Sequence, residues 1–273
     1  MTFVYHTFDD PFEADRTGNP LAADFDYAIT CCEGSLQHYA RMGTPAICLY
    51  PPYDEEIHGN AHPEEEFDCD FSLVATNLYP KSRFPKVLVE RSQLARLMVG
   101  MGSARFYGPW DKRHGWGGEF GVPDLKSHWH GFLKFDRLAA LFVSTKINVN
   151  THVRPDGYRY LNERTCLLLG AGAFMMCDRV AGLEEWSDNE RRFVLFSSLD
   201  EFVEKARYYL DRPKERAEIA ARGQAFAEDR FSSTAFARDL CRFVGRPMEP
   251  ARTEPTTTAP SLDHPPSAAV SGG

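Results

Sequence analysis

The chain lacks any run of apolar residues long enough to cross a bilayer, so we expect no membrane-spanning helix. Its first twenty residues also lack an apolar segment and contain Asp9, Asp10, Glu13 and Asp15, which argues against a signal peptide. No internal repeat is present, so the sequence does not read as an array of small repeated units.

Positive charge is scarce as well. The chain has 31 lysines and arginines against 39 aspartates and glutamates, which gives a formal net charge of -8. Proteins that neutralise nucleic-acid phosphates usually carry a basic excess, so the net charge argues against a nucleic-acid partner. It does not exclude a local patch of basic residues.

Cysteine is present but forms no disulfide pattern. The number is odd, and several of the cysteines fall in predicted apolar strands or helices, which indicates reduced, buried thiols in a cytoplasmic protein. The seven are Cys31, Cys32, Cys48, Cys69, Cys166, Cys177 and Cys241.

Metal-binding patterns are incomplete. No CxxC or HExxH spacing occurs, and His114, His128 and His130 in a long irregular segment lack further ligands, so we expect no metal site. The pattern from Asp68 to Asp70 could offer two carboxylates to a divalent cation. It directly precedes a predicted strand, however, so it lies at the amino end of the sheet, away from the ligand edge, and we favour a structural role.

What the sequence does contain is a regular alternation of strands and helices over residues 67–178, which predicts an α/β fold with a parallel, doubly wound sheet. Hydrophobic residues make up 43% of the 273 residues, enough for a substantial core. The central unit spans residues 146–178 and reads strand, polar turn, helix, strand. Its first strand ends at the turn formed by Pro155, Asp156 and Gly157.

Three regions are predicted. Residues 1–60 form a partial N-terminal segment of strands around a helix at 35–42, and residues 61–245 form the main domain. Residues 246–273 are rich in proline, threonine, serine and alanine without an apolar period, so we expect a disordered tail.

Candidate site residues gather where the first strand of the central unit ends. Ligands of parallel sheets bind beyond the carboxyl ends of the strands, which places His152, Arg154 and the following helix start at the expected site. Arg154, Arg159 and Arg164 could hold phosphates together with the helix N-terminus, or could form ordinary surface ion pairs. Tyr158 could lie against a base or sugar.

The central unit carries a resemblance to a known family. The segment KINVNTHVRPDGYRYL, then NERTCLLLGAGAFMMCDRVAGLEEW and VLFSSLDEFVEKARYYLDRP, resembles the C-terminal half of glycosyltransferase group 1-like proteins of the CgeB, spore-maturation type. The likeness covers about residues 67–240 and extends more weakly to HTFDDP and DFDYAITCCEGSLQHYARMG. Asn162, Arg164, Gly170 and Gly172 match the family pattern, whereas Leu167 stands where the family has a ribose-binding glutamate.

The resemblance implies a GT-B fold of two Rossmann-like domains, of which the N-terminal one is truncated here. It also implies a metal-independent glycosyltransferase that uses a nucleotide-sugar donor as a substrate, needs no cofactor, and acts on an unknown acceptor. A second chain could supply the missing acceptor domain. The alternative is a non-catalytic sugar-nucleotide-binding or assembly protein.

The candidate residues can be given roles within this frame. Candidate catalytic residues on the acceptor side are His6, Asp9 and Asp10, any of which could serve as a general base. The candidate donor-binding residues are Asn77, Tyr79, His152, Arg154, Gly157, Tyr158, Asn162, Glu163 and Arg164.

Overall fold

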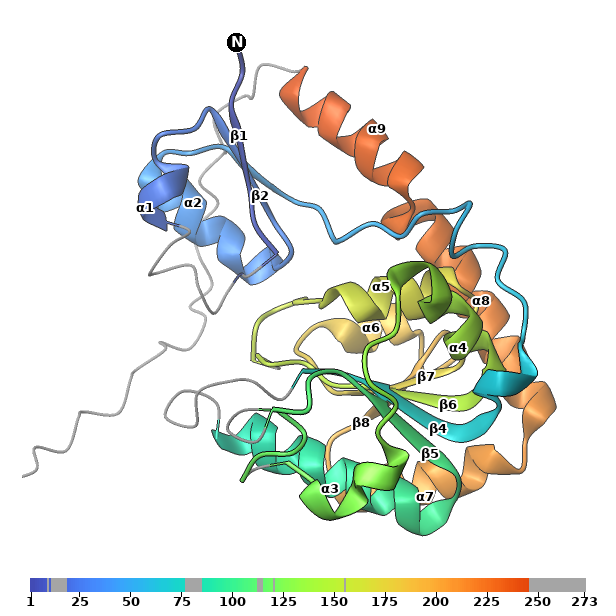
Figure 1. The fold of residues 1–273 in the computed structure, drawn as a ribbon. Coiled ribbons are helices and arrows are strands. Elements are labelled where there is room, and N and C mark those ends of the chain that lie inside the picture. The colour runs from blue at the N-terminus through green and yellow to red at the C-terminus, as the bar shows by residue number, and fades with distance from the viewer. Residues whose placement is uncertain are drawn as a thin grey trace, which may run out of the picture.

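The computed structural model describes residues 1–8, 10, 19–76, 85–111, 115–119, 121–154 and 156–245. Within this part the chain forms two parallel sheets, one of three strands and one of five (Figure 1). None of the helices in these segments has the length and apolar character that a bilayer span requires. The predicted tail at 246–273 lies outside the described residues.

The N-terminal sheet has the order β1-β2-β3. Its strands are β1 (Val4–His6), β2 (Tyr27–Thr30) and β3 (Ala46–Cys48). Three short helical segments accompany them: α1 (Asn19–Ala22), the 3-10 turn η2 (Glu33–Ser35) and α2 (Leu36–Met42). Gly43 ends α2 with a φ of 78°, a left-handed conformation that suits glycine. The helical spacing predicts that Tyr39 and Ala40 both face inward; Tyr39 is buried, whereas Ala40 is exposed.

The larger sheet has the order β5-β4-β6-β7-β8, and all its pairings are parallel. This order confirms the predicted doubly wound sheet, and it places a topological switch point between β4 and β6. The strands are β4 (Cys69–Val74), β5 (Ala104–Tyr107), β6 (Thr145–Asn150), β7 (Met175–Asp178) and β8 (Val194–Phe196).

Helices cover both faces of the larger sheet (Figure 1). The helical segments are η3 (Glu65–Phe67), α3 (Pro85–Met101), η4 (Pro123–His128), η5 (Phe135–Arg137), α4 (Leu138–Ser144), α5 (Glu163–Gly170), α6 (Leu183–Ser187), α7 (Leu199–Leu210), α8 (Pro213–Phe231) and α9 (Ser233–Val244). One face packs on α3 and α7 through residues such as Leu94, Met98 and Phe202, and the other packs on α4, α5 and α8 through Leu141 and Leu168.

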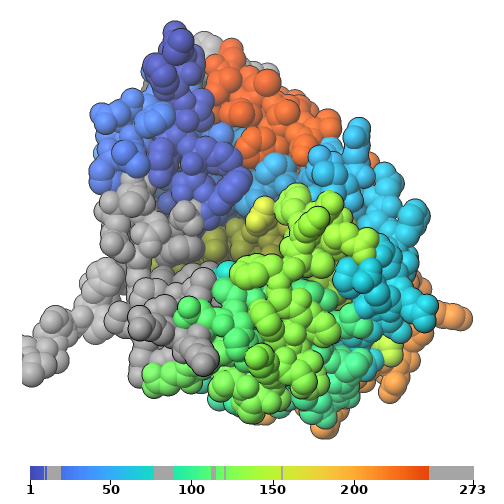
Figure 2. All heavy atoms as spheres, in the orientation of Figure 1, coloured from blue at the N-terminus to red at the C-terminus, as the bar shows by residue number. Residues whose placement is uncertain are grey.

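The last helix returns to the N-terminal sheet. The ring of Phe236 lies 5.7 Å from that of His6, and the ring of Phe243 lies 5.2 Å from that of Tyr27. In Figure 2 the orange atoms of α9 accordingly lie beside the blue atoms of the first residues. The helix α9 therefore packs against the N-terminal sheet. The domain boundary near residue 60 stays a prediction.

Candidate functional site

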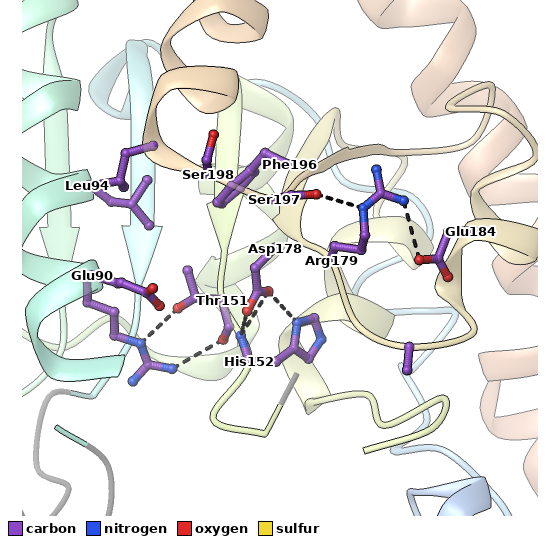
Figure 3. Close-up of a pocket in the computed structure, with 13 residues that line it drawn as sticks. Glu90, Leu94, Thr151, His152, Asp178, Arg179, Glu184, Phe196, Ser197 and Ser198 are labelled. Atoms are coloured by element: carbon purple, nitrogen blue, oxygen red, sulfur yellow. Dashed lines mark hydrogen bonds and ion pairs between the residues drawn. The ribbon is translucent and has the colours of Figure 1, made fainter. Parts of the chain in front are cut away.

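A pocket of about 370 Å³ opens at the carboxyl edge of the five-stranded sheet (Figure 3). Its volume falls in the range of small-molecule sites. Residues at the carboxyl ends of three strands line the pocket. Thr151 and His152 follow β6, Asp178 ends β7 and is followed by Arg179, and Ser197 follows β8. The full lining comprises Glu90, Arg91, Leu94, Thr151, His152, Asp178, Arg179, Ala181, Glu184, Phe196, Ser197, Ser198 and Leu199.

His152 is buried beneath this pocket and both of its ring nitrogens are engaged. Nδ1 lies 2.7 Å from Asp178 Oδ1, and Nε2 lies 3.1 Å from Thr165 Oγ1. The His152 backbone N–H also donates to the same carboxylate, at 3.0 and 2.9 Å from its two oxygens. Both ring nitrogens of His152 already have hydrogen-bond partners. We therefore assign His152 to positioning Asp178 and α5 rather than to proton transfer.

Arg91 holds the switch point between β4 and β6. Its side chain is on α3 and only 1% of the residue is exposed. Nε donates to Thr151 Oγ1 at 2.8 Å, Nη2 donates to the Thr151 carbonyl at 3.2 Å, and Nη1 donates to the Thr76 carbonyl at 2.5 Å. The guanidinium therefore joins the carboxyl ends of two neighbouring strands.

Arg179 and Glu184 line the opposite side of the pocket from Glu90 (Figure 3). The Arg179 Nε donates to Ser197 Oγ at 2.8 Å, and Nη1 lies 3.3 Å from Glu184 Oε1. Ser198 caps α7 by accepting a hydrogen bond from the Glu201 backbone N–H, so the start of that helix is fixed beside the pocket. The pocket thus combines fixed polar groups with the apolar side chains of Leu94, Phe196 and Leu199.

Two predicted donor residues support this edge from α5. Asn162 caps α5 by accepting from the Thr165 backbone N–H, and its amide donates to the Thr151 carbonyl at 3.0 Å. Arg164 donates from Nε to Asn150 Oδ1 at 3.2 Å. The capping explains why α5 begins at Glu163, so the N-terminus of this helix lies six residues beyond Gly157.

Glu163 and Leu167 lie one turn apart on the same side of α5 but differ in exposure. Glu163 is exposed, whereas Leu167 is 1% exposed and belongs to the core. A carboxylate at position 167 would have to be buried at that point of the core, which disfavours it strongly.

The predicted residues Arg154, Gly157 and Tyr158 do not line the pocket. Arg154 forms an ion pair with Asp156 at 2.8 Å and lowers the pKa of that carboxyl. Tyr158, which directly follows Gly157, accepts a hydrogen bond at its backbone carbonyl from the Gly34 backbone N–H at 3.1 Å. This segment therefore contacts the N-terminal part of the chain.

Arg159 strengthens the same contact. Its Nη1 lies 3.0 Å from Glu33 Oε2, and its Nη2 also pairs with Glu185. Of the two readings of this arginine, phosphate ligand or ion pair, the structure shows the ion pair.

The candidate catalytic residues differ in exposure. Asp10 is 1% exposed and accepts a hydrogen bond from the Tyr39 hydroxyl at 2.7 Å, so its carboxylate is turned into the N-terminal core. His6 ends β1 and is exposed as a residue; its ring lies 4.2 Å from that of Phe8, and partial burial lowers the pKa of the imidazole. Asp9, Asn77 and Tyr79 lie outside the described residues.

No group of three potential metal ligands occurs in the segments that the structure describes. His128 Nδ1 lies 3.2 Å from the Ala104 carbonyl, and burial lowers the pKa of His130. His114 lies outside the described residues. Asp70 stands near the amino end of β4, as expected for a structural residue, with its carboxylate 2.7 Å from Lys146 Nζ.

Asp70 should make stability depend on pH. Burial alone would raise its pKa, but hydrogen bonds from Lys146 and Ser103 outweigh it and lower the pKa. The stabilisation is therefore complete above the unfolded value of about 3.9 and is lost as pH falls through the lower folded value. Asp70→Asn should cost about 1 kcal/mol at pH 7 and little at pH 3, as measured by urea unfolding. Asp68→Asn is the control, and an equal pH dependence in it would contradict the assignment.

The sequence-based site omitted several lining residues, namely Glu90, Arg91, Asp178, Arg179, Glu184 and Ser197. Asp178 and Arg179 carried a usable signal, because only Cys177 separates them from the apolar residues 174–176 of the second predicted strand of the central unit, which places them near the ligand edge. Glu90 and Arg91 carried none, because one charged pair within a helix is typical of any solvated helix face.

The family described as glycosyl transferase-like matches residues 88–242, more than half of the chain. No curated protein matches in sequence. Sucrose-phosphate synthase of Thermosynechococcus elongatus matches in structure with a TM-score of 0.60 and 12% identity, over 89% of this chain and 66% of that one. Anabaena HepE, solved with UDP-glucose, matches with a TM-score of 0.63 and 14% sequence identity, over 89% of this chain and 71% of HepE.

A third structural match is Staphylococcus aureus TarM, solved with Fondaparinux, α-GlcNAc-glycerol and UDP. It gives a TM-score of 0.61 and 9% identity, over 90% of this chain and 50% of that one. The chain thus spans 66% of the synthase and half of TarM. At these identities the likeness establishes the fold alone, which is the GT-B arrangement of parallel α/β sheets.

Proposed function

The chain belongs to the glycosyl transferase-like family, and we propose that it transfers a sugar from a nucleotide-sugar donor to an acceptor. One observation carries the proposal: every residue that lines the carboxyl-edge pocket lies within residues 88–242, the family match. The UDP-glucose in HepE supports a donor of the nucleotide-sugar class. Membership of the CgeB-type subgroup and a cytoplasmic location belong to the same proposal.

The donor would lie along the carboxyl edge of the sheet. Asp178 lines the pocket, Thr165 belongs to the first turn of α5, and the imidazole of His152 contacts both. The pocket and the start of α5 are therefore only one side chain apart. With the nucleoside of the donor in the pocket, the diphosphate of the donor can extend towards Asn162, Arg164 and the amino end of α5.

Charge then builds up on the diphosphate as the sugar leaves. Arg164 and the amino end of α5 would offset it, which is electrostatic stabilisation of the transition state, with Arg154 as a second cation on the same edge. On the acceptor side, His6 is the exposed candidate base among the described residues. The lowered pKa of His6 keeps its imidazole neutral at pH 7, as a general base requires.

Binding of nucleoside diphosphates, measured by calorimetry, tests the donor site. We expect at least one of GDP, UDP, ADP and CDP to bind. Arg164→Ala should lower the affinity for that nucleoside diphosphate about tenfold. It should change the affinity for the matching nucleoside little, because the lost charge faces phosphate. The control is Arg238→Ala on α9, where the guanidinium pairs with Asp239. Equal losses for diphosphate and nucleoside would contradict the phosphate role, and binding of none would refute the donor site.

A second function, donor binding without transfer, is favoured by the burial of Asp10. Hydrolysis of a bound nucleotide-sugar separates the two, because a transferase releases nucleoside diphosphate slowly even to water and a binder releases none. The acceptor stays a prediction, and so does a second chain that would complete its site.

A further inference from the structure

We infer that the carboxyl-edge pocket selects guanine, with Arg179 and Glu184 reading the base. This inference rests on the proposed donor site and deepens it. It begins with the charges of the lining, continues with the hydrogen-bonding groups that Arg179 and Glu184 leave available, and ends with the base whose edge complements them.

The charge of the lining excludes the diphosphate from the pocket itself. Glu90, Asp178 and Glu184 contribute three carboxylates, whereas Arg91 and Arg179 contribute two guanidinium groups. Both cations already donate to protein oxygens. Two phosphates would therefore meet net repulsion, while a nucleoside brings neutral N–H and O–H donors that carboxylates accept. The nucleoside is the part of the donor that fits.

Arg179 and Glu184 leave one donor and one acceptor side by side. The Arg179 Nε and Nη1 are engaged with Ser197 and Glu184, and Nη2 makes no hydrogen bond to the described residues. On Glu184 the ion pair uses Oε1, and Oε2 has no partner among the described residues. The side chains are 38% and 46% exposed, so both groups are accessible to a ligand.

Guanine complements this arrangement better than the other bases. Along its pairing edge it presents the O6 acceptor and then two donors, N1–H and the N2 amino group. O6 can accept from Arg179 Nη2. Of the two guanine donors, one can bind the unengaged Oε2 of Glu184 and the other the remaining lone pair of Oε1, as a charge-assisted pair. Uracil presents an acceptor, one donor and another acceptor, so its second carbonyl would face the carboxylate. Adenine and cytosine place a ring-nitrogen acceptor where guanine has N1–H.

The remaining lining suits a flat ring with an attached ribose. Leu94, Phe196 and Leu199 provide apolar contact for the base. Glu90 lies on the opposite side of the pocket from Arg179 and Glu184 (Figure 3), where it can accept from a ribose hydroxyl.

The test compares GDP, IDP, UDP, ADP and CDP by calorimetry on the full chain. We expect GDP to bind at least tenfold more tightly than UDP, ADP or CDP, and IDP, which lacks the N2 amino group, to lose about fivefold relative to GDP. A site that hydrogen-bonds a polar edge rejects ligands lacking it by such factors or more. If UDP, ADP or CDP binds as tightly as GDP, the inference is wrong while the donor site stands; if no nucleotide binds, the donor site itself fails.

Glu184→Gln assigns the selectivity to its residue. This substitution should lower the affinity for GDP at least tenfold. It should leave the affinity for UDP unchanged or slightly higher, because a neutral amide no longer repels the second carbonyl of uracil. The matched control is Glu185→Gln, a neighbour on α6 that pairs with Arg159 and does not line the pocket. A Glu184→Gln variant that folds and keeps its preference for GDP would overturn the assignment, and the wild-type nucleotide series decides the inference if that variant does not fold.

Discussion

Arg91→Ala should lower the free energy of unfolding by about 2–4 kcal/mol, measured by urea denaturation at pH 7. The side chain is almost fully buried, and its three nitrogens satisfy oxygens of Thr76 and Thr151. Removing it leaves two carbonyls at the ends of β4 and β6 without these donors and opens a cavity beside Leu94. The same variant should lose nucleotide affinity, because Thr151 lines the pocket.

A matched control lies on the same helix. Arg96 pairs with Asp124, and the two side chains are 49% and 55% exposed. Arg96→Ala should leave stability almost unchanged, since water and salt screen an exposed pair. Arg91→Lys should fall between the two, because a single ammonium cannot reach both strands as the planar guanidinium does. If Arg91→Ala were no more damaging than Arg96→Ala, the joining of the strands would not contribute to stability.

The fold was largely readable from the sequence because alternating apolar residues mark one face of a strand. Ile147 and Val149 alternate with Asn148 and Asn150, and the strand β6 forms there with the two apolar residues in one core cluster, although both asparagines are buried as well. Capping residues marked the ends of helices better than turn residues marked the end of a strand. Gly43 ends α2 and Ser198 caps α7, as glycine and serine typically do, whereas β6 ends at Asn150, five residues before the turn predicted at 155–157.

The site was readable only in part, because a pattern gives the edge of a sheet but not the partner of a side chain. His152 lies at the predicted edge, yet its contacts with Asp178 and Thr165 come from residues 26 and 13 positions away. Arg159 shows the same limit: its partner Glu33 is 126 positions away and belongs to the other sheet region. Long-range pairing of this kind decides whether an arginine is a ligand or a support.

His152→Ala should also cost about 2–4 kcal/mol of stability, through a different mechanism. The imidazole joins Asp178 to Thr165, and Thr165 in turn accepts from the Asn150 amide at 2.8 Å. Without the ring, a buried hydroxyl and a partly buried carboxylate lose a partner, and a cavity forms next to Tyr160, whose ring lies 5.7 Å from that of His152. Urea unfolding measures the loss.

Two further variants distinguish this network from simple loss of volume. His152→Asn keeps a donor near the position of Nδ1 and should retain the contact with Asp178, so we expect it to be less destabilising than His152→Ala. Thr165→Val removes the hydroxyl from the other end of the network. Because His152 and Thr165 are in contact, their effects should not add in the double variant, with a coupling of about 1 kcal/mol. Strict additivity would mean that the ring acts through packing alone, and the polar connection between the pocket and α5 would then have no energetic role.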